Sequence, residues 1–182
     1  STLIMGLVID DRGLVPEPII ASAVLAGGLL SDIGTEAQRE AFLNPMIEGQ
    51  TSLAFAYAET QSRYALNDCK TTATKDGSTY KINGEKVWVL NGHAADQIIV
   101  AARTGGGQFD DEGLSLFVVD GDAAGLERVR VNQMDGQRSA ILRFNDVAVG
   151  GDRLLGREGE ARATIELAVD RGAAAACAEG FG

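Results

Sequence analysis

Residues 69–90, "CKTTATKDGSTYKINGEKVWVL", decide the fold class of this chain. β-Branched and aromatic residues recur here among polar ones, a composition and spacing typical of half-buried β-strands. Asp76-Gly77 and Asn83-Gly84 are dipeptides typical of two-residue hairpin turns. The stretch therefore predicts a strand, a turn, a second strand, a second turn and a third strand.

Further strands are expected toward the C-terminus. Residues 96–104 ("DQIIVAART") and 114–120 ("LSLFVVD") are rich in β-forming residues, and the loop between them begins with three glycines. Residues 126–133 and 140–149 complete a set of about seven or eight strands. Many short strands at this spacing favour an antiparallel sandwich or barrel.

Helical patterns lie on both sides of the predicted strands. Residues 15–34 begin with two prolines, place apolar residues at helical spacing and end at Gly34. Thr35 and Gln38 have the spacing of a capping box, which predicts the start of a second helix. The pattern is helical again from Glu158. The fold class is therefore α+β, with helices before and after a β domain.

Composition excludes several classes of protein. The chain has 182 residues, 45% of them hydrophobic, which is enough for one sizeable core. Its 16 Lys and Arg against 26 Asp and Glu give a net charge of -10, which argues against nucleic acid as a partner. The apolar run at residues 19–30 is too short to span a membrane. Cys69 and Cys177 are interpreted as free thiols, and a cytoplasmic location is expected.

Few side chains suggest chemistry by themselves. His93 is the single histidine and has no neighbouring ligand residues, so no metal site is expected. Glu59 is either a general base or a structural carboxylate bound to nearby donors. Trp88, the single tryptophan, either packs in the core or forms the wall of a site for a planar ligand. Arg138 is interpreted as an edge cation.

Four stretches, taken in order, resemble the acyl-CoA dehydrogenase family. Residues 34–50 ("GTEAQREAFLNPMIEGQ") are similar to the family's helix before the sheet, and residues 54–60 ("AFAYAET") stand in the place of its Thr-Glu-Pro flavin segment. Residues 80–92 resemble its Asn-Gly-x-Lys-x-Trp-x-Thr-Asn-Gly hairpin. Residues 134–156 resemble its Gly-x-Arg-Ser and Leu-Leu-Gly signature. The resemblance covers nearly the whole chain.

The family fold has an N-terminal helical domain, a middle β domain and a C-terminal helical bundle. The resemblance implies that residues 1–50 are the end of the first domain and residues 51–157 the second. Residues 158–182 would be the first helix of a truncated bundle. Both termini have apolar or alanine-rich sequence rather than polar ends, so the chain is expected to be an internal fragment of a longer protein.

The resemblance also implies an activity. The family desaturates an acyl-CoA thioester between Cα and Cβ, as in fatty acid β-oxidation, with FAD as the electron sink. It implies an acyl-CoA substrate, an electron-transfer acceptor and a homo- or hetero-oligomer with another dehydrogenase subunit. The family's base is a carboxylate in the C-terminal bundle. No catalytic residue is therefore assigned within the chain, the base is expected beyond Gly182, and the fragment alone is expected to be inactive.

The resemblance further implies which residues bind the flavin. Ala58 stands where the family has a threonine that bonds the ring, and Leu90 replaces a second such threonine. Trp88 matches the tryptophan that flanks the ring, whereas Glu59 matches a structural glutamate. The residues expected to bind the cofactor are Phe55, Tyr57, Ala58, Arg63, Tyr64, Trp88, Val89 and Leu90.

Two hypotheses follow from these matches and replacements. The sequence around residues 59–64 is most similar to that of the small subunits of bacterial heteromeric dehydrogenases, of the pimeloyl-CoA dehydrogenase kind. The chain is then either an FAD-dependent acyl-CoA dehydrogenase subunit acting on an acyl-CoA, including dicarboxylyl-CoA or steroid-side-chain-CoA thioesters, or a non-catalytic partner subunit with a degenerate flavin site. The sequence leaves open the acyl chain length and the choice between dehydrogenase and oxidase chemistry.

Overall fold

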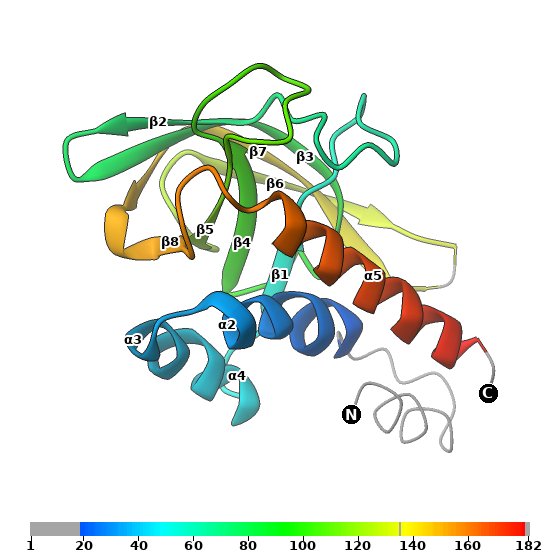
Figure 1. The fold of residues 1–182 in the computed structure, drawn as a ribbon. Coiled ribbons are helices and arrows are strands. Elements are labelled where there is room, and N and C mark those ends of the chain that lie inside the picture. The colour runs from blue at the N-terminus through cyan, green and yellow to red at the C-terminus, as the bar shows by residue number, and fades with distance from the viewer. Residues whose placement is uncertain (1–18, 135, 181–182) are drawn as a thin grey trace.

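The structure, a computed structural model, describes residues 19–134 and 136–180. This part of the chain begins with helices (Figure 1). A π-helical segment continues directly into an α-helix that stops at Gly34, whose N–H bonds the Leu30 carbonyl at 3.0 Å. The predicted stop at Gly34 is therefore confirmed. The helical elements before the sheet are η1 (Ile19–Gly27), α2 (Gly28–Ile33), α3 (Glu36–Gln38), η2 (Arg39–Leu43) and α4 (Asn44–Ile47).

The predicted capping box is confirmed, and it also docks the helices onto the sheet. The Thr35 hydroxyl accepts a bond from the Gln38 N–H, and the Gln38 side-chain oxygen accepts one from the Thr35 N–H at 2.9 Å. The amide nitrogen of the same Gln38 donates to the carbonyls of Asp152 and Leu154 at 2.7 and 2.9 Å. Gln38 thus satisfies orphan groups at a helix start and ties that start to a distant segment.

The strands form one mixed, mostly antiparallel sheet in the order β6-β7-β3-β2-β4-β5-β8, with β1 paired to β4. Two strand pairings are parallel, β1 with β4 and β2 with β4. The long connection 57–71 lets β2 run in the same direction as β1, and the two reversals before and after β3 give β4 that direction again. The strands are β1 (Leu53–Ala56), β2 (Thr72–Asp76), β3 (Thr79–Leu90), β4 (Gln97–Arg103), β5 (Leu114–Asp120), β6 (Leu126–Asn132), β7 (Arg138–Gly150) and β8 (Leu154–Leu155).

The two predicted hairpin turns have different outcomes. Asp76-Gly77 does connect β2 and β3, and Gly77 has the positive φ of 64° that such a turn requires. The turn predicted at Asn83-Gly84 is wrong, because both residues lie inside β3. There the register to β7 shifts beside Gly84, and a Cβ on this glycine would lie 2.6 Å from the Thr71 hydroxyl. Gly84 therefore allows a close backbone approach at a β-bulge.

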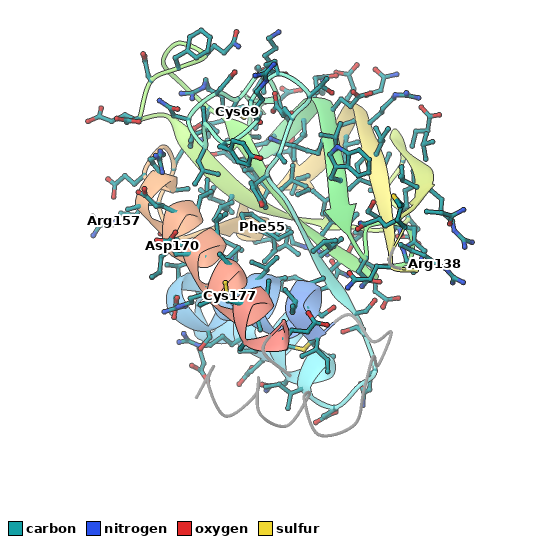
Figure 2. All side chains as sticks on the ribbon, turned by 90° about the vertical axis from the view of Figure 1, so that its right-hand side faces the viewer. Phe55, Cys69, Arg138, Arg157, Asp170 and Cys177 are labelled. Carbon is teal, nitrogen blue, oxygen red and sulfur yellow. The ribbon has the colours of Figure 1, made fainter. Side chains whose placement is uncertain are left out.

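The curved sheet has buried residues on both faces. On its inner face the rings of Tyr80 and Phe117, from strands that are not neighbours, lie 4.8 Å apart, which shows how far the sheet curls. On its outer face Phe55, Ile99 and Leu116 pack with residues of η1 and α2. Figure 2 shows Phe55 in this layer between sheet and helices. Strands β4 and β5 are therefore buried along almost their whole length.

Helix α5 (Arg162–Glu179) crosses the N-terminal helices (Figure 1). Gly172 lies at the crossing, where a Cβ would come within 2.6 Å of Leu25. An ion pair between Arg171 and Asp32 joins α5 to α2. Among the described residues, no helix combines the length and apolarity that crossing a membrane requires.

The predicted α+β fold class, with helices, a β domain and a further helix, is confirmed. The helices before the sheet span residues 19–47, the strands and the short 3-10 helix η3 (Gly151–Arg153) fall within residues 53–155, and α5 begins at Arg162. The domain boundaries after residues 50 and 157 stay a prediction. The two prolines at the predicted start of the first helix lie outside the described residues.

Candidate functional site

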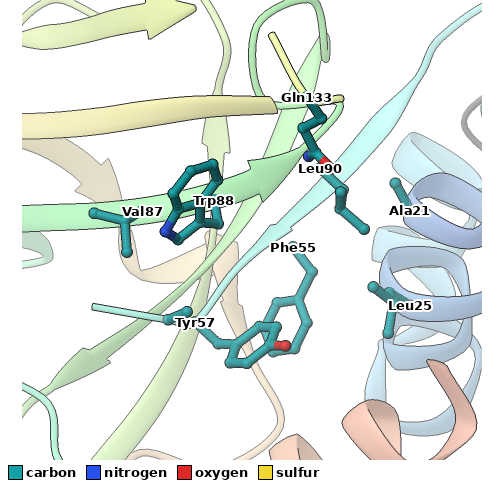
Figure 3. Close-up of a pocket in the computed structure, with 9 residues that line it drawn as sticks. Ala21, Leu25, Phe55, Tyr57, Val87, Trp88, Leu90 and Gln133 are labelled. Atoms are coloured by element: carbon teal, nitrogen blue, oxygen red, sulfur yellow. The ribbon is translucent and has the colours of Figure 1, made fainter. Parts of the chain in front are cut away.

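A cavity of about 360 Å³ opens between the sheet and the N-terminal helices. Aromatic residues of β1 and β3 lie on its sheet side, and small and apolar residues of η1 lie opposite (Figure 3). This volume is within the range of about 300–1,000 Å³ typical of small-molecule pockets. The lining residues are Ala21, Leu25, Phe55, Tyr57, Ala58, Val87, Trp88, Leu90 and Gln133.

A β-bulge directs Trp88 toward this cavity. The register between β3 and β7 shifts between Lys86 and Val89, so the two residues between them face a single partner position. Trp88 has a φ of 54°, which is strained for a non-glycine residue. Its side chain is 64% exposed, so the interpretation of Trp88 as a core residue is wrong. An exposed indole held in a strained conformation at a cavity mouth fits contact with a planar ligand.

The segment that follows β1 is tied to the same bulge. The Val87 N–H donates to the Ala58 carbonyl at 2.9 Å, and the Lys86 ammonium donates to the Tyr57 carbonyl at 3.2 Å. The cavity wall formed by Tyr57 and Ala58 is thus cross-linked to the wall formed by Val87 and its neighbour Trp88. Neither contact uses a side chain that lines the cavity.

Glu59 lies behind this wall, 4% exposed. Its carboxylate accepts bonds from the Lys86 ammonium at 2.8 Å and from the backbone N–H groups of Lys70 and Thr71 at 2.8 and 3.0 Å. The Gln61 amide adds a bond of 2.8 Å. Since its acceptor sites are filled by protein donors, the carboxylate has a structural role, and the interpretation of Glu59 as a general base is not supported.

Burial and charge change the proton affinities around Glu59. Burial acts to raise the pKa of Glu59, but the charge and hydrogen bond of Lys86, with bonds from Gln61 and Thr71, lower it to about 2. Burial raises the pKa of the Cys69 thiol, which donates to Glu59 at 3.3 Å. Burial likewise raises the pKa of Tyr57. The ionised carboxylate and its neutral neighbours therefore stay fixed through the neutral pH range.

The structure brings most of the predicted ligand residues together, but not all. Phe55, Tyr57, Ala58, Trp88 and Leu90 line the cavity.

The other three predicted residues lie elsewhere. Val89 points into the inner core and is 1% exposed. Tyr64 is 98% exposed on the connection 57–71, and neither it nor Arg63 lines the cavity. The positions of Val89, in a bulged strand, and of Arg63 and Tyr64, in a loop, could not be predicted from the spacing of residues in the sequence alone.

Sequence reasoning missed four lining residues and the buried lysine behind them. Ala21 and Leu25 come from η1, and Gln133 follows β6, so their contribution depends on tertiary packing that no local pattern reveals. Lys86 lies in the stretch 80–92 that resembles the family motif. A lysine at the otherwise apolar end of this strand is the sequence feature that could have indicated it. Within residues 19–134 and 136–180, no three His, Cys, Asp or Glu side chains gather as a metal site.

One buried hydroxyl beside the cavity has no partner among the described residues. Ser139 is fully buried, and its Oγ makes no hydrogen bond. Ser139 pairs with the cavity residue Leu90 across β7 and β3, and cross-strand partners share a face of the sheet. The free hydroxyl is therefore a donor on the same face as the cavity.

We expect Ser139→Ala to stabilise the ligand-free protein by about 1 kcal/mol, because the variant removes a buried group without a partner. Chemical denaturation of the ligand-free protein measures this. Ser115→Ala is the matched control and should be destabilised, because the buried Ser115 hydroxyl accepts a bond from the Gly159 N–H at 2.8 Å. A loss of stability in Ser139→Ala would contradict the absence of a partner.

Comparison with known proteins identifies the family. The family description "Acyl-CoA dehydrogenase, middle domain" matches residues 54–147. Acyl-CoA dehydrogenase FadE29 of Mycobacterium tuberculosis is 32% identical over 150 residues, which are 82% of this chain and 38% of the relative. The short-chain-specific acyl-CoA dehydrogenase of Megasphaera elsdenii is 31% identical over 89% of this chain and 43% of its own length. The chain thus spans about two fifths of these relatives.

Solved structures agree with this assignment. Butyryl-CoA dehydrogenase from Megasphaera elsdenii superimposes with a TM-score of 0.85 at 30% identity, over 89% of this chain and 43% of that chain. A glutaryl-coenzyme A dehydrogenase complex shares the fold, with a TM-score of 0.91 at 20% identity, over 98% of this chain and 47% of that chain. With these similarities and the family match over more than half of its residues, the chain belongs to the acyl-CoA dehydrogenase family.

Proposed function

We propose that this chain is part of an FAD-dependent acyl-CoA dehydrogenase subunit that desaturates an acyl-CoA thioester between Cα and Cβ. The observation that carries the proposal is the cavity beside Trp88, where five of the eight residues predicted to bind flavin meet. The relatives named above are acyl-CoA dehydrogenases, but the chain covers 38% and 43% of the first two. The activity therefore belongs to the intact protein.

The lining residues fit a flavin ring in shape and in part in polarity. Trp88 offers an exposed aromatic face, and Tyr57 and Ala58 form a wall whose backbone is held in place by bonds from Lys86 and Val87 to their carbonyls. Leu25 and Phe55 exclude water from the helix side. Bound FAD would supply the acceptor for the hydride that leaves Cβ. The residues of this chain would bind and orient the ring, while the base that takes the α-proton is expected outside them.

A second candidate function is that of a non-catalytic partner subunit. Ala58 and Leu90 line the cavity without a polar side-chain atom, where the family has hydroxyls that bond the ring. Each missing hydrogen bond weakens binding by about 0.5–1.5 kcal/mol. In that case the chain would carry a degenerate flavin site beside an active sister subunit, which would oxidise the acyl-CoA. Under either candidate, dicarboxylyl-CoA and steroid-side-chain-CoA thioesters are the acyl-CoA kinds to test.

The visible absorption spectrum of the full-length protein tests both candidates. The protein is purified alone, and again after co-expression with a neighbouring dehydrogenase subunit. A flavin spectrum from the protein alone supports the flavoenzyme. Flavin that appears only with the partner supports the degenerate site, and no flavin in either sample contradicts both. Turnover of acyl-CoA with an artificial electron acceptor, with and without oxygen, then separates a dehydrogenase from an oxidase.

A further inference from the structure

Lys86 is the most deeply buried charged side chain that the structure describes, and no solvent reaches it. Its ammonium has three neighbours, namely Glu59 Oε1 at 2.8 Å, the Tyr57 carbonyl at 3.2 Å and the Cys69 sulfur at 3.6 Å. A buried ammonium has a high desolvation cost, and all of its donors here are spent on groups that come from one connection, residues 57–71. The lysine therefore organises that connection.

The bonds made by Lys86 and its neighbour Val87 lie directly beside residues that line the cavity. Along β3, Lys86 holds the Tyr57 carbonyl, and the next residue, Val87, holds the Ala58 carbonyl at 2.9 Å. Trp88 follows directly and faces the cavity. Along the other wall, Tyr57 and Ala58 face the cavity. Two adjacent residues of one wall thus fix two adjacent residues of the other.

The charge of Lys86 also balances the groups behind the wall. Among the residues that the structure describes, Glu59 is the only carboxylate bonded to it, and Glu59 in turn holds the N–H groups of Lys70 and Thr71. Without the ammonium, Glu59 would be a buried charge with no counterion, and the Tyr57 carbonyl would lose its donor. A variant of Lys86 therefore has two separable effects, a loss of charge balance and a loss of wall geometry.

We propose that Lys86 is a positioning residue for the flavin site, and that its bond to the Tyr57 carbonyl sets the spacing between the Tyr57–Ala58 wall and the indole of Trp88. This inference rests on the proposed function for the identity of the ligand. The geometric part concerns the two walls alone and is measurable without any ligand.

The test compares three variants of the full-length protein. Lys86→Met removes both the charge and the carbonyl bond. The double variant Lys86→Met with Glu59→Gln removes the bond but leaves no unbalanced charge. Lys81→Met is the matched control, because Lys81 lies on the same strand and forms an exposed ion pair with Asp76 at 2.9 Å. Circular dichroism and the thermal midpoint report whether each variant folds.

The first readout is the environment of Trp88 in flavin-free protein, taken as the fluorescence that disappears in Trp88→Phe. We expect its emission maximum and its quenching by acrylamide to shift in Lys86→Met and in the double variant, and to stay as in the wild type in Lys81→Met. The thermal midpoint should recover in the double variant relative to Lys86→Met. A Trp88 signal that recovers together with the midpoint would overturn the inference, since Lys86 would then act by charge balance only.

The second readout is FAD affinity, measured by titration of the flavin-free protein. We expect about tenfold to a hundredfold weaker binding in both variants that lack Lys86, the loss that corresponds to one charge-assisted hydrogen bond. Unchanged affinity and unchanged Trp88 fluorescence in the double variant would reject the positioning role while leaving the proposed function intact. A wild type that binds no FAD alone, with a shifted Trp88 signal in the variants, would reject the flavin site of a self-sufficient subunit and support the role of Lys86 in positioning the two walls.

Discussion

Arg103→Met is expected to lower the free energy of unfolding by about 3 kcal/mol, because it removes several charge-assisted hydrogen bonds at once. Arg103 is 6% exposed at the end of β4. Its guanidinium has no carboxylate partner among the described residues and instead donates to backbone carbonyls. The acceptors and distances are Cys69 at 3.4 Å, Gly105 at 3.4 Å, Glu112 at 2.8 Å, Asn67 at 2.8 Å, Gln108 at 3.1 Å and Asp110 at 3.0 Å.

These carbonyls belong to two loops that three further bonds also connect. The Cys69 N–H donates to the Gln108 carbonyl at 3.1 Å, and the side-chain amides of Asn67 and Gln108 add one bond each, at 2.8 and 2.7 Å. Methionine fills the volume of the arginine stem but removes the Arg103 donors from all six carbonyls, of which the Gln108 carbonyl keeps the Cys69 N–H, so we expect the loops at residues 67–69 and 105–112 to open more often to solvent. Urea unfolding measures the loss of stability, and amide hydrogen exchange localises it to these loops.

Arg143→Met is the matched control for this prediction. Arg143 is an exposed arginine of the same sheet that pairs with Glu85 at 2.8 Å and Glu127 at 3.3 Å. Surface ion pairs contribute little to stability, so this variant should unfold close to the wild type. Equal losses in the two variants would mean that the carbonyl contacts of Arg103 add nothing beyond an ordinary surface charge.

The sequence predicts those parts of the fold that depend on neighbouring residues. The capping box of Thr35 and Gln38 involves residues three apart, and the turn at Gly77 involves a dipeptide, so both follow from local chemistry. The strands β4 and β5 follow from short segments rich in β-forming residues. Each of these features was predicted correctly because it depends on residues that are close together in the sequence.

The errors arise where a distant partner or a shift in register decides the outcome. Gly84 has the signature of a hairpin, but its small size is required by Thr71 on the connection before β2. Trp88 stands among buried neighbours in β3, and a one-residue bulge turns its side chain outward, because such an insertion exchanges the two faces of a strand. Neither the contact of Gly84 nor the bulge at Trp88 can be detected from the spacing of residues in the sequence.

The candidate site was likewise predictable on one side only. The wall residues Tyr57, Ala58 and Leu90 were identified from motif resemblance, since they lie within matched stretches. Lys86 lies within a matched stretch too, but its partner Glu59 is 27 residues away, so its burial could not be inferred from either segment alone. Pairing of opposite charges across the two stretches is the signal that would have indicated it.

The second large effect is a loss of stability at acidic pH, which we expect from the protonation of Glu59. Glu59 has a pKa of about 2 in the folded protein against 4.5 for an ordinary glutamate. A carboxyl whose pKa is lowered by folding stabilises the protein above its unfolded pKa, and the stabilisation is lost as the pH falls toward the folded pKa. The difference of about 2.5 units corresponds to about 3 kcal/mol. We expect this part of the stability to be complete at pH 6 and above, and to disappear between about pH 5 and pH 2.

The prediction is checked by urea unfolding at a series of pH values between 6 and 2. The free energy of unfolding should fall with a slope that includes about one proton taken up by Glu59. In the double variant Lys86→Met with Glu59→Gln the buried pair is absent, so the slope should decrease by about that one proton. Identical slopes in the two proteins would show that acid acts on other carboxyls. A smaller slope in the double variant would mean that the same buried pair that holds the cavity wall also sets the lower pH limit of the fold.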